Sequence, residues 1–293
     1  MTEHFDADWL ALREPFDHAA RNVALARRLA DRLPRRPRLL DLGAGTGSLF
    51  RFLAPIIGRG QDWIVIDRDA DLLDEAFGRT AAWARRQGFA ATAPGDALLV
   101  STPGGLWRMQ AMQRDLTVVN AHVPASAVPD ADAVLCSALL DLVSSAWLAR
   151  LFDSLHVPFF ASLTVDGRDA WQPRHPEDAL VRSAFRRDQR YDKGFGPALG
   201  MAASSVALKA LAARDFATAS APTDWHVPRA ALRMQRALID GAADAARDAS
   251  PAHRRAIADW QEARLRQAMR GRLAITIGHR DILALPQGIP SGG

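Results

Sequence analysis

The sequence predicts an α/β fold in which a doubly wound, mostly parallel sheet carries helices on both faces. Strand and helix patterns alternate five times along the chain, which is typical of parallel sheets. A glycine-rich turn joins the first strand to a helix, and no crossover helix follows the last strand, so that strand is expected to pair antiparallel at the edge. With 293 residues, 48% of them hydrophobic and 24% charged, the chain is excluded from the disordered and fibrous classes.

The first half of the chain predicts a regular series of elements. Apolar side chains recur at helical spacing over residues 8–33, until Pro34 and Pro37 end the helix. Four further elements follow, each ended by a glycine or an acid: strand 38–42, helix 48–57, strand 62–67 and helix 69–86.

The second half completes a sheet of seven strands. A third strand at 106–113 follows a small insertion at 92–105 that is rich in proline and glycine. The polar segment 168–198 is expected to be a lid or binding insert. The remaining elements are strand 132–137, helix 139–155, strand 157–165, helix 199–213, strand 215–220, two or three helices over 229–270, and a last strand at 272–284.

Composition excludes several classes of protein. No apolar stretch approaches the roughly 18 residues that a membrane span requires, and the N-terminus has no apolar core of a signal peptide, so we expect a cytoplasmic protein without membrane association. Cys136 is the single cysteine, which excludes an internal disulfide and argues against cysteine-based zinc or iron–sulfur sites; we expect no metal. The arginines are scattered among acids instead of forming a basic stripe, which argues against nucleic acid as a partner.

The most informative motif is the run Asp41-Leu42-Gly43-Ala44-Gly45-Thr46-Gly47 between the first strand and the next helix. Glycines permit a tight turn and a close approach of the backbone to a ligand, and the helix presents free N–H groups there. Asp67 ends the second strand 20 residues after Gly47. An acid at this place can accept hydrogen bonds from both hydroxyls of a ribose.

The glycine spacing separates the two ligand classes that such a site fits. A dinucleotide fingerprint would require glycine at position 48, where this chain has Ser48. The pattern D-x-G-x-G-x-G instead resembles that of class I S-adenosylmethionine-dependent methyltransferases. Asp41 also suits a sulfonium and an ammonium better than a pyrophosphate. The resemblance covers residues 38–166, is only topological beyond them, and implies a Rossmann-like fold with S-adenosyl-L-methionine as cofactor and S-adenosylhomocysteine as product.

The resemblance also implies a role for the matching positions. Asp41 would anchor the loop and face the methionyl amine, Asp67 would hold the ribose, and Ser137 would lie beside the transferred methyl. Asp115 and Leu116 would meet the adenine, with Asp96 and Asn120 as alternatives to Asp115. The predicted cofactor-binding residues are Arg21, Asp41, Gly43, Ala44, Gly45, Thr46, Gly47, Asp67, Arg68, Asp115, Leu116 and Ser137.

The methyl acceptor is less visible in the sequence. In-line methyl transfer needs mainly positioning, and a base only where the acceptor is protonated. Residues 137–140 lack the proline pair of many base-methylating enzymes, and Cys136 is expected to be a core residue. Aromatic residues are not interleaved with basic ones as in single-strand binders. We therefore predict O-, N- or C-methylation of a small polar metabolite.

Two segments are candidates for the acceptor pocket. The N-terminal helix carries a charged face on which Arg21 could bind a carboxylate, or which could be solvated. The segment 175–200 contains Tyr191 and Asp192 as candidate bases, Lys193 to orient an anion and His175 as a further base. The alternative for this segment is a capped loop before the helix at 199.

We predict a single methyltransferase domain over 1–293. It comprises a cap helix (1–36), a cofactor-binding core (37–220) with the insert at 168–198, a helical insertion (221–271) and the last strand (272–286). Helices within 229–270 would either cover the acceptor or form a homodimer. The segments 137–144, 192–200 and 278–286 resemble a group of bacterial methyltransferase-like proteins without an assigned acceptor.

Three other functions stay open at this point. The chain could methylate a nucleic acid such as tRNA or rRNA, bind S-adenosylmethionine as a non-catalytic regulatory subunit, or act as an NAD(P)-dependent oxidoreductase. The last would require Ser48 to tolerate a pyrophosphate, and the chain lacks a Tyr-x-x-x-Lys pair because Phe195 follows Tyr191 at that spacing.

Overall fold

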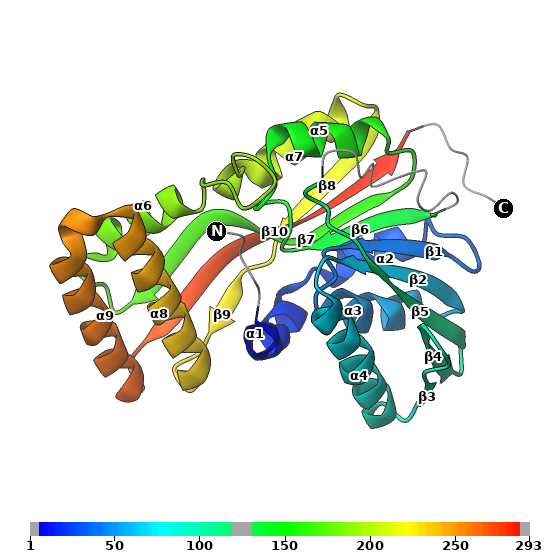
Figure 1. Ribbon diagram of the computed structural model, residues 1–293, viewed down its shortest axis with the longest axis horizontal. Coiled ribbons are helices and arrows are strands. Elements are labelled where there is room, and N and C mark those ends of the chain that lie inside the picture. Colours follow the sequence, from blue (N-terminus) through cyan, green and yellow to red (C-terminus); the bar gives the residue numbers. More distant parts are fainter. Residues whose placement is uncertain (1–5, 119–130, 288–293) are drawn as a thin grey trace.

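A computed structural model describes residues 6–118 and 131–287, and one sheet runs through it from end to end (Figure 1). Its strands are β1 (Arg38–Leu42), β2 (Gln61–Asp67), β3 (Ala90–Thr92), β4 (Ala97–Thr102), β5 (Gly105–Gln113), β6 (Ala133–Ser137), β7 (Phe159–Gln172), β8 (Phe216–Pro222), β9 (Trp225–Val227) and β10 (Ala274–Pro286). The helices are α1 (Ala7–Ala20), α2 (Val23–Ala30), α3 (Ser48–Ile57), α4 (Ala70–Arg86), α5 (Ser145–Asp153), α6 (Asp178–Asp188), α7 (Ala203–Ala212), α8 (Leu232–Ala249) and α9 (Arg254–Met269), with short 3₁₀ turns at Gly200–Ala202 and Pro251–His253.

The strand order confirms the Rossmann-like, doubly wound prediction. The sheet runs β3-β4-β5-β2-β1-β6-β7-β10-β8, with β9 paired to β10. From β5 to β7 the neighbouring strands are parallel, and β10 is antiparallel to both β7 and β8. The last strand is therefore antiparallel as predicted, but the expectation that it lies at the edge was wrong, because β8 lies outside it. The order reverses between β1 and β6, which is where open α/β sheets bind ligands.

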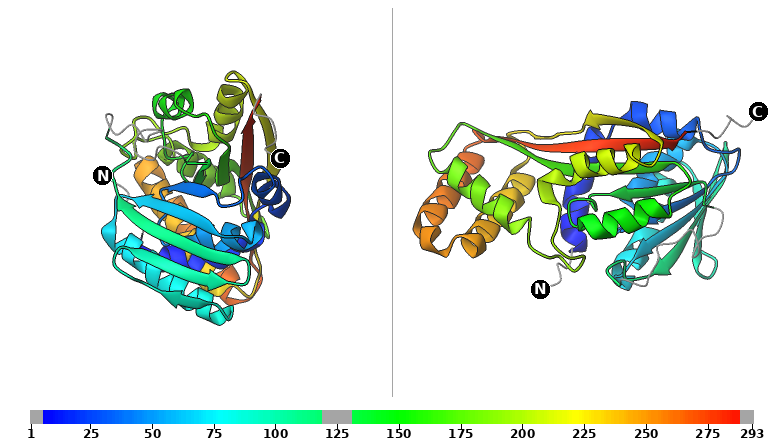
Figure 2. Two further views of the ribbon diagram at one scale, coloured as in Figure 1. Left: turned by 90° about the vertical axis from the view of Figure 1, so that its right-hand side faces the viewer. Right: turned by 90° about the horizontal axis from the view of Figure 1, so that it is seen from above.

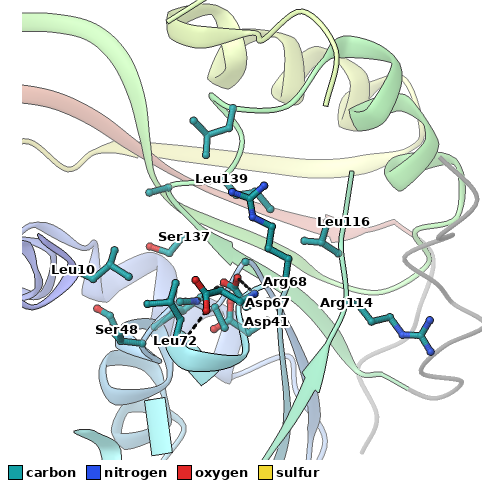
Figure 3. A pocket seen from close by; sticks show the side chains of 18 of the residues that line it. Leu10, Asp41, Ser48, Asp67, Arg68, Leu72, Arg114, Leu116, Ser137 and Leu139 are labelled. Carbon is teal, nitrogen blue, oxygen red and sulfur yellow. Dashed lines mark hydrogen bonds between the residues drawn. The ribbon is translucent and has the colours of Figure 1, made fainter. Parts of the chain in front are cut away.

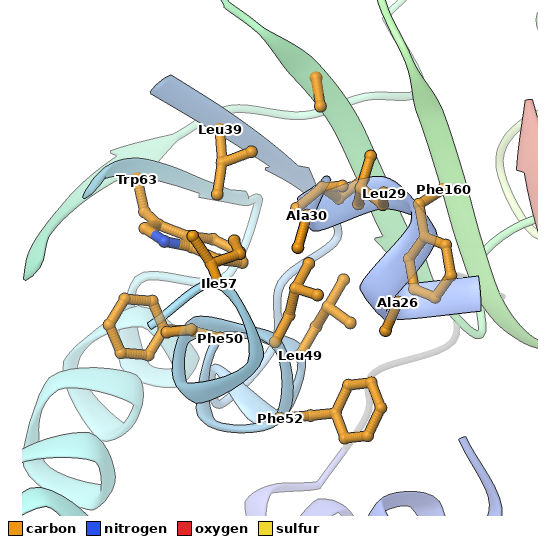
Figure 4. Packing of buried hydrophobic residues seen from close by; sticks show 14 of the residues in the cluster. Ala26, Leu29, Ala30, Leu39, Leu49, Phe50, Phe52, Ile57, Trp63 and Phe160 are labelled. Atoms are coloured by element: carbon orange, nitrogen blue, oxygen red, sulfur yellow. The ribbon is translucent and has the colours of Figure 1, made fainter. Parts of the chain in front are cut away.

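Alternate residues of β1 pack on opposite faces of the sheet. Leu39 belongs to the apolar cluster under α2 and α3, whereas Leu40 belongs to the cluster under α5 and α7. Figure 4 shows the first cluster, in which Phe50 of α3 meets Trp63 of β2 with ring centroids 5.0 Å apart. Each such buried side chain contributes roughly 1.5–3 kcal/mol, so the packing of these helices stabilises the central strands.

The structure has ten strands in the described residues where the sequence predicted seven. The insertion predicted at 92–105 forms most of the β3–β4–β5 meander, and β9 is a further short strand. Gly104 makes the meander possible, because a Cβ there would lie 1.7 Å from the backbone oxygen of Gly58. Short antiparallel edge strands carry little periodicity, which explains why the sequence pattern did not reveal them.

The predicted helix at 8–33 was wrong: it is two helices that break at Arg21. The backbone of Arg21 is extended (φ −53°, ψ 140°), and the Asn22 side chain caps α2 by accepting from the Leu25 N–H. The Asn22 N–H donates to Asp281 of β10 over 2.8 Å. Asp281 also accepts from the N–H of Leu163, so a tertiary contact, absent from the local pattern, fixes the break.

Two further boundaries were also wrong. The helix predicted at 139–155 is shorter, since Ser144 caps α5 through the Trp147 N–H. The strand predicted to end at 165 continues to Gln172 and is paired with β10 except at two register shifts. Figure 2 shows these two long strands running beyond the rest of the sheet to a separate group of helices, α6, α8 and α9, which pack around Trp171, Trp260 and Ile275.

No helix within 6–118 or 131–287 is long and apolar enough to cross a membrane.

Candidate functional site

A cavity of about 150 Å³ opens at the carboxyl ends of β1, β2 and β6. We call it the loop cavity because residues 43–46 line it. All predicted cofactor-binding residues except Gly47 face it. Figure 3 shows Leu10 of α1 on one side of this cavity, and Leu116 and Leu139 on the other. The structure thus brings together residues from four strand ends and the N-terminal helix.

The glycine loop has the backbone geometry that its sequence requires. Gly43, Gly45 and Gly47 have φ values of 66°, 51° and 77°, a region that other residues rarely adopt. The loop is tied to β2: the N–H of Ala44 donates to the Ile66 carbonyl oxygen over 2.9 Å, and that of Gly45 donates to Asp67 Oδ2 over 2.8 Å.

Asp67 is held for hydrogen bonding at the end of β2. Its Oδ2 accepts from Gly45 and its Oδ1 accepts from the N–H of Asp69. Burial raises the pKa of Asp67, and the backbone N–H groups oppose that rise. A carboxylate oxygen can accept more than one hydrogen bond. Both oxygens therefore keep capacity for hydroxyl donors from a ligand.

Asp41 is fully buried beneath the loop, with neither carboxyl oxygen hydrogen-bonded within the described residues. Burial raises the pKa of Asp41 to about 8; Arg21 lowers it and Asp67 raises it further. A buried carboxyl without partners is unfavourable, and a native structure retains one chiefly where it has a use. The position calls for a cationic or hydrogen-bond-donating ligand group.

Arg21 carries the complementary charge in the same cavity. Its guanidinium is buried and donates to three hydroxyls: Ser137 Oγ at 2.9 Å, Ser48 Oγ at 3.0 Å and Ser162 Oγ at 3.3 Å. Burial lowers the pKa of Arg21, and no carboxylate of the described chain lies within ion-pair distance of it. The sequence had left open that the charged face of the N-terminal helix is solvated. For Arg21 this alternative is wrong, because its side chain is buried.

The adenine positions predicted from the sequence lie at the mouth of the loop cavity. Asp115 is exposed and accepts from the N–H and hydroxyl of Thr117, bonds that lower its pKa. Leu116 is buried, and its carbonyl accepts from Trp147 Nε1. Asp96 bonds to Gln110 on β5 instead of lining the cavity, and Asn120 lies outside the described residues.

The four predicted catalytic residues are not brought together. Lys193 lines the loop cavity and pairs with Asp188 at 3.3 Å. Tyr191 is 58% exposed, and Asp192 accepts from two backbone N–H groups of its own turn. His175 accepts from the Glu177 N–H at the start of α6. Of the four, only Lys193 lines a cavity.

A larger cavity of about 440 Å³ adjoins the first, and the segments predicted for the acceptor site, the N-terminal helix, 175–200 and 229–270, supply only part of its lining. We call it the distal cavity. Residues of β7 from Leu163 to Trp171 form part of its wall, together with residues of α1, α6, α8, β9 and β10. The two cavities share Arg13, Ala138, Leu142 and Lys193. The alternation of side chains over residues 163–171 could have indicated that the strand continues along this cavity. The predicted strand ended at 165, so this pattern was not recognised.

Arg13 is fixed where the cavities meet. Its Nε lies 3.0 Å from Asp17 Oδ2, and its guanidinium lies over the Trp225 ring at 4.9 Å. Trp225 Nε1 donates to Asp17, so α1 and β9 position one another. The side of α1 that carries Arg13 therefore lines the cavities.

Other residues that line the loop cavity had not been predicted as cofactor-binding. Leu10 and Ser48 face it from α1 and α3, and Leu72 from α4. Phe195 lines it from the glycine-rich segment and packs on Trp147 at 5.5 Å. Leu10, Leu72 and Phe195 belong to no sequence motif, so the sequence alone did not indicate that they line the cavity.

Solved structures of methyltransferases resemble this chain. An S-adenosylmethionine-dependent methyltransferase from Thiobacillus denitrificans, in complex with S-adenosyl-L-homocysteine, is 14% identical with a TM-score of 0.43, over 97% of this chain and 100% of that chain. One from Geobacter sulfurreducens, with the same ligand, is 13% identical with a TM-score of 0.43, over 92% and 93%. Geranyl diphosphate C-methyltransferase from Streptomyces coelicolor is 12% identical with a TM-score of 0.39, over 90% and 80%. No protein-family model and no curated protein matches the chain.

Proposed function

We propose that this protein is an S-adenosylmethionine-dependent methyltransferase that acts on a small molecule. The observation that carries the proposal is that Asp41 and Arg21 both line the loop cavity, each of them buried and neither in an ion pair within the part of the chain that the structure describes. A buried carboxyl without partners faces the same space as a buried guanidinium without a carboxylate. An amino acid moiety supplies both missing charges, an ammonium for Asp41 and a carboxylate for Arg21.

The remaining residues of the loop cavity fit the rest of such a cofactor. Asp67 keeps acceptor capacity for ribose hydroxyls, and Leu72 and Leu116 offer apolar surface for a base. A dinucleotide fits less well, because its pyrophosphate would lie near Asp41 and Asp67. These contacts support the cofactor predicted from the glycine loop.

A bound S-adenosylmethionine supplies an electrophilic methyl group. The chain's part is to hold the acceptor in line and to exclude water. Leu10 and Phe195 add apolar surface to the loop cavity. Ala138 and Leu142 line both cavities, so an acceptor bound in the distal cavity would reach the methyl group past these two residues. Lys193 is proposed to orient the acceptor, whereas Tyr191, which lines neither cavity, is given no role.

The distal cavity is the proposed acceptor site, and its form favours a small molecule over a nucleic acid. Helices α6 and α8 line it, which supports the first of the two roles predicted for residues 229–270, covering the acceptor or forming a homodimer. The sequence suggested a small polar metabolite, but the aromatic lining suits an acceptor with an apolar body. Homodimer formation and location in the cytoplasm stay predictions.

Cofactor binding by Asp67→Ala tests the proposal. Calorimetric titration with S-adenosylhomocysteine is expected to show binding by the wild type and a loss of at least about tenfold in the variant, because a charged hydrogen-bond acceptor is removed. Asp62→Ala is the matched control: this residue begins the same strand and pairs with Arg36 at the surface. Equal affinity of Asp67→Ala and the wild type would show that the cofactor lies elsewhere.

A further inference from the structure

The distal cavity has an apolar, aromatic lining. Trp9, Trp171, Trp225 and Phe185 face it, and Val165 and Ile277 add aliphatic surface from β7 and β10. Its volume of about 440 Å³ is within the range of sites for drug-sized ligands. Such a lining suits a ligand with a flat or extended apolar body.

Asp169, Asp178 and Asp188, three of the four acids that line this cavity, have cationic partners within the protein. Asp169 pairs with Arg182 and also accepts from Trp171. Asp178 pairs with Arg264, and Asp188 pairs with Lys193. A ligand cation would have to displace these existing ion pairs. These three acids therefore give the cavity little preference for a cationic ligand.

Arg186 of α6 differs from the other cations of this cavity. Its Nη2 donates to the carbonyl oxygen of Gly167 over 2.5 Å, and its buried Nε has no hydrogen-bond partner in the described structure. No acid of residues 6–118 and 131–287 lies within ion-pair distance of it. Arg168, by contrast, pairs with both Asp166 and Asp224. Arg186 is thus a cation that keeps donors for an anion.

The position of Arg186 also fixes the length of the ligand. Ser162 pairs with Ser137 at the loop cavity, and Gly167 follows five residues later on β7. That separation is at most about 16 Å, the value for a fully regular strand, because Leu163 and Gly167 have φ values of 56° and 79°. A ligand that reaches from the loop cavity to Arg186 is therefore elongated, with its anionic group at the end remote from the methyl donor.

We propose that the distal cavity binds an elongated aromatic or otherwise apolar acid and that Arg186 holds its anionic group. This inference rests on the proposed function for the statement that the ligand is the methyl acceptor. The binding site itself does not depend on the cofactor, so the two can be tested separately.

Two fluorescent probes of the same shape test the anion site. 8-Anilinonaphthalene-1-sulfonate carries an anionic group, and N-phenyl-1-naphthylamine is its uncharged counterpart. Each is titrated into the full-length protein without cofactor, with emission excited through the cavity tryptophans. We expect Arg186→Gln to weaken binding of the sulfonate by about tenfold, the loss of one charged hydrogen-bonded contact, and to change binding of the neutral probe by less than about twofold.

Controls locate the effect. Arg190→Gln removes an exposed arginine that lines neither cavity and is expected to change neither affinity. Arg186→Lys keeps the charge and is expected to retain part of the sulfonate affinity. Ala242→Phe narrows the distal cavity from α8 and is expected to weaken both probes. S-Adenosylhomocysteine is expected not to displace the sulfonate.

Three results would overturn the proposal: equal loss of both probes in Arg186→Gln while circular dichroism shows it folded, unchanged sulfonate affinity in that variant, or displacement of the sulfonate by S-adenosylhomocysteine. Failure of the proposed function has a different signature, namely absent S-adenosylhomocysteine binding with the probe results intact.

Discussion

Replacement of Asp41 by asparagine is expected to stabilise the fold while weakening cofactor binding. Burial keeps the pKa of Asp41 near 8 in the folded protein against 3.8 in the unfolded chain. Between these values the unfolded chain is ionised and the folded protein is not. Stability therefore falls as pH rises through this window, by about 1.4 kcal/mol per pH unit. Asparagine is neutral in both the folded and the unfolded state, so the variant does not lose stability in this way as pH rises.

The magnitude follows from the same window. At pH 7 the variant is expected to exceed the wild type in free energy of unfolding by at most about 4 kcal/mol. At pH 4 this difference is close to zero. Even about a quarter of the ceiling corresponds to a rise of roughly 2–4 °C in Tm for a chain of this size. Cofactor affinity is expected to move the other way, by about tenfold or more, since the ligand ammonium loses its charged partner.

Thermal unfolding of Asp41→Asn and the wild type at several pH values measures this effect. Asp62→Asn, at the start of β2, is the control and is expected to show no pH-dependent gain. The reasoning would be refuted by a variant that is less stable than the wild type at pH 8, or by a gain in Tm that does not shrink toward pH 4.

Further predictions concern stability and the remaining cavity residues. Gly104→Ala is expected to destabilise by about 1–3 kcal/mol in denaturant unfolding, since its Cβ meets Gly58 backbone, whereas Gly78→Ala on α4, with open space, gains up to about 1 kcal/mol. Burial lowers the pKa of His279 to about 4, so the unfolded chain takes up a proton at a higher pH than the folded protein does. The free energy of unfolding is therefore expected to fall by up to about 3 kcal/mol between pH 6.5 and pH 4. His279→Gln is expected to lose less stability over this range in denaturant unfolding. Arg21→Met is expected to weaken S-adenosylhomocysteine by about tenfold in calorimetry, and unchanged affinity would remove Arg21 from the site.

Local patterns made most of the core predictable. The segment from β1 to α4 was predicted to within about a residue, because buried strands, the glycine loop and helix stop signals are properties of neighbouring residues. The same loop indicated the cavity, since the carboxyl ends of parallel strands share one edge.

Other features could not be predicted because they depend on contacts between residues far apart in the sequence. The break at Arg21 depends on Asp281, which is 260 residues away along the chain, and no proline or glycine announces it. The extension of β7 passes through Gly167, which looks like a turn but lies at a register shift within the strand, and pairing with β10 resumes at Asp169. The distal cavity depends on both, so its residues could be recognised only once the strands and helices were placed.

The most direct measurement is calorimetric titration of the wild type with S-adenosylhomocysteine, with NADH in parallel, at pH 7 in two buffers of different ionisation enthalpy. We expect S-adenosylhomocysteine alone to bind, with release of about one proton as Asp41 ionises against the ligand ammonium. The Asp41→Asn variant is expected to release none. Binding of NADH alone, or of neither ligand, would contradict the assignment of the loop cavity to S-adenosylmethionine.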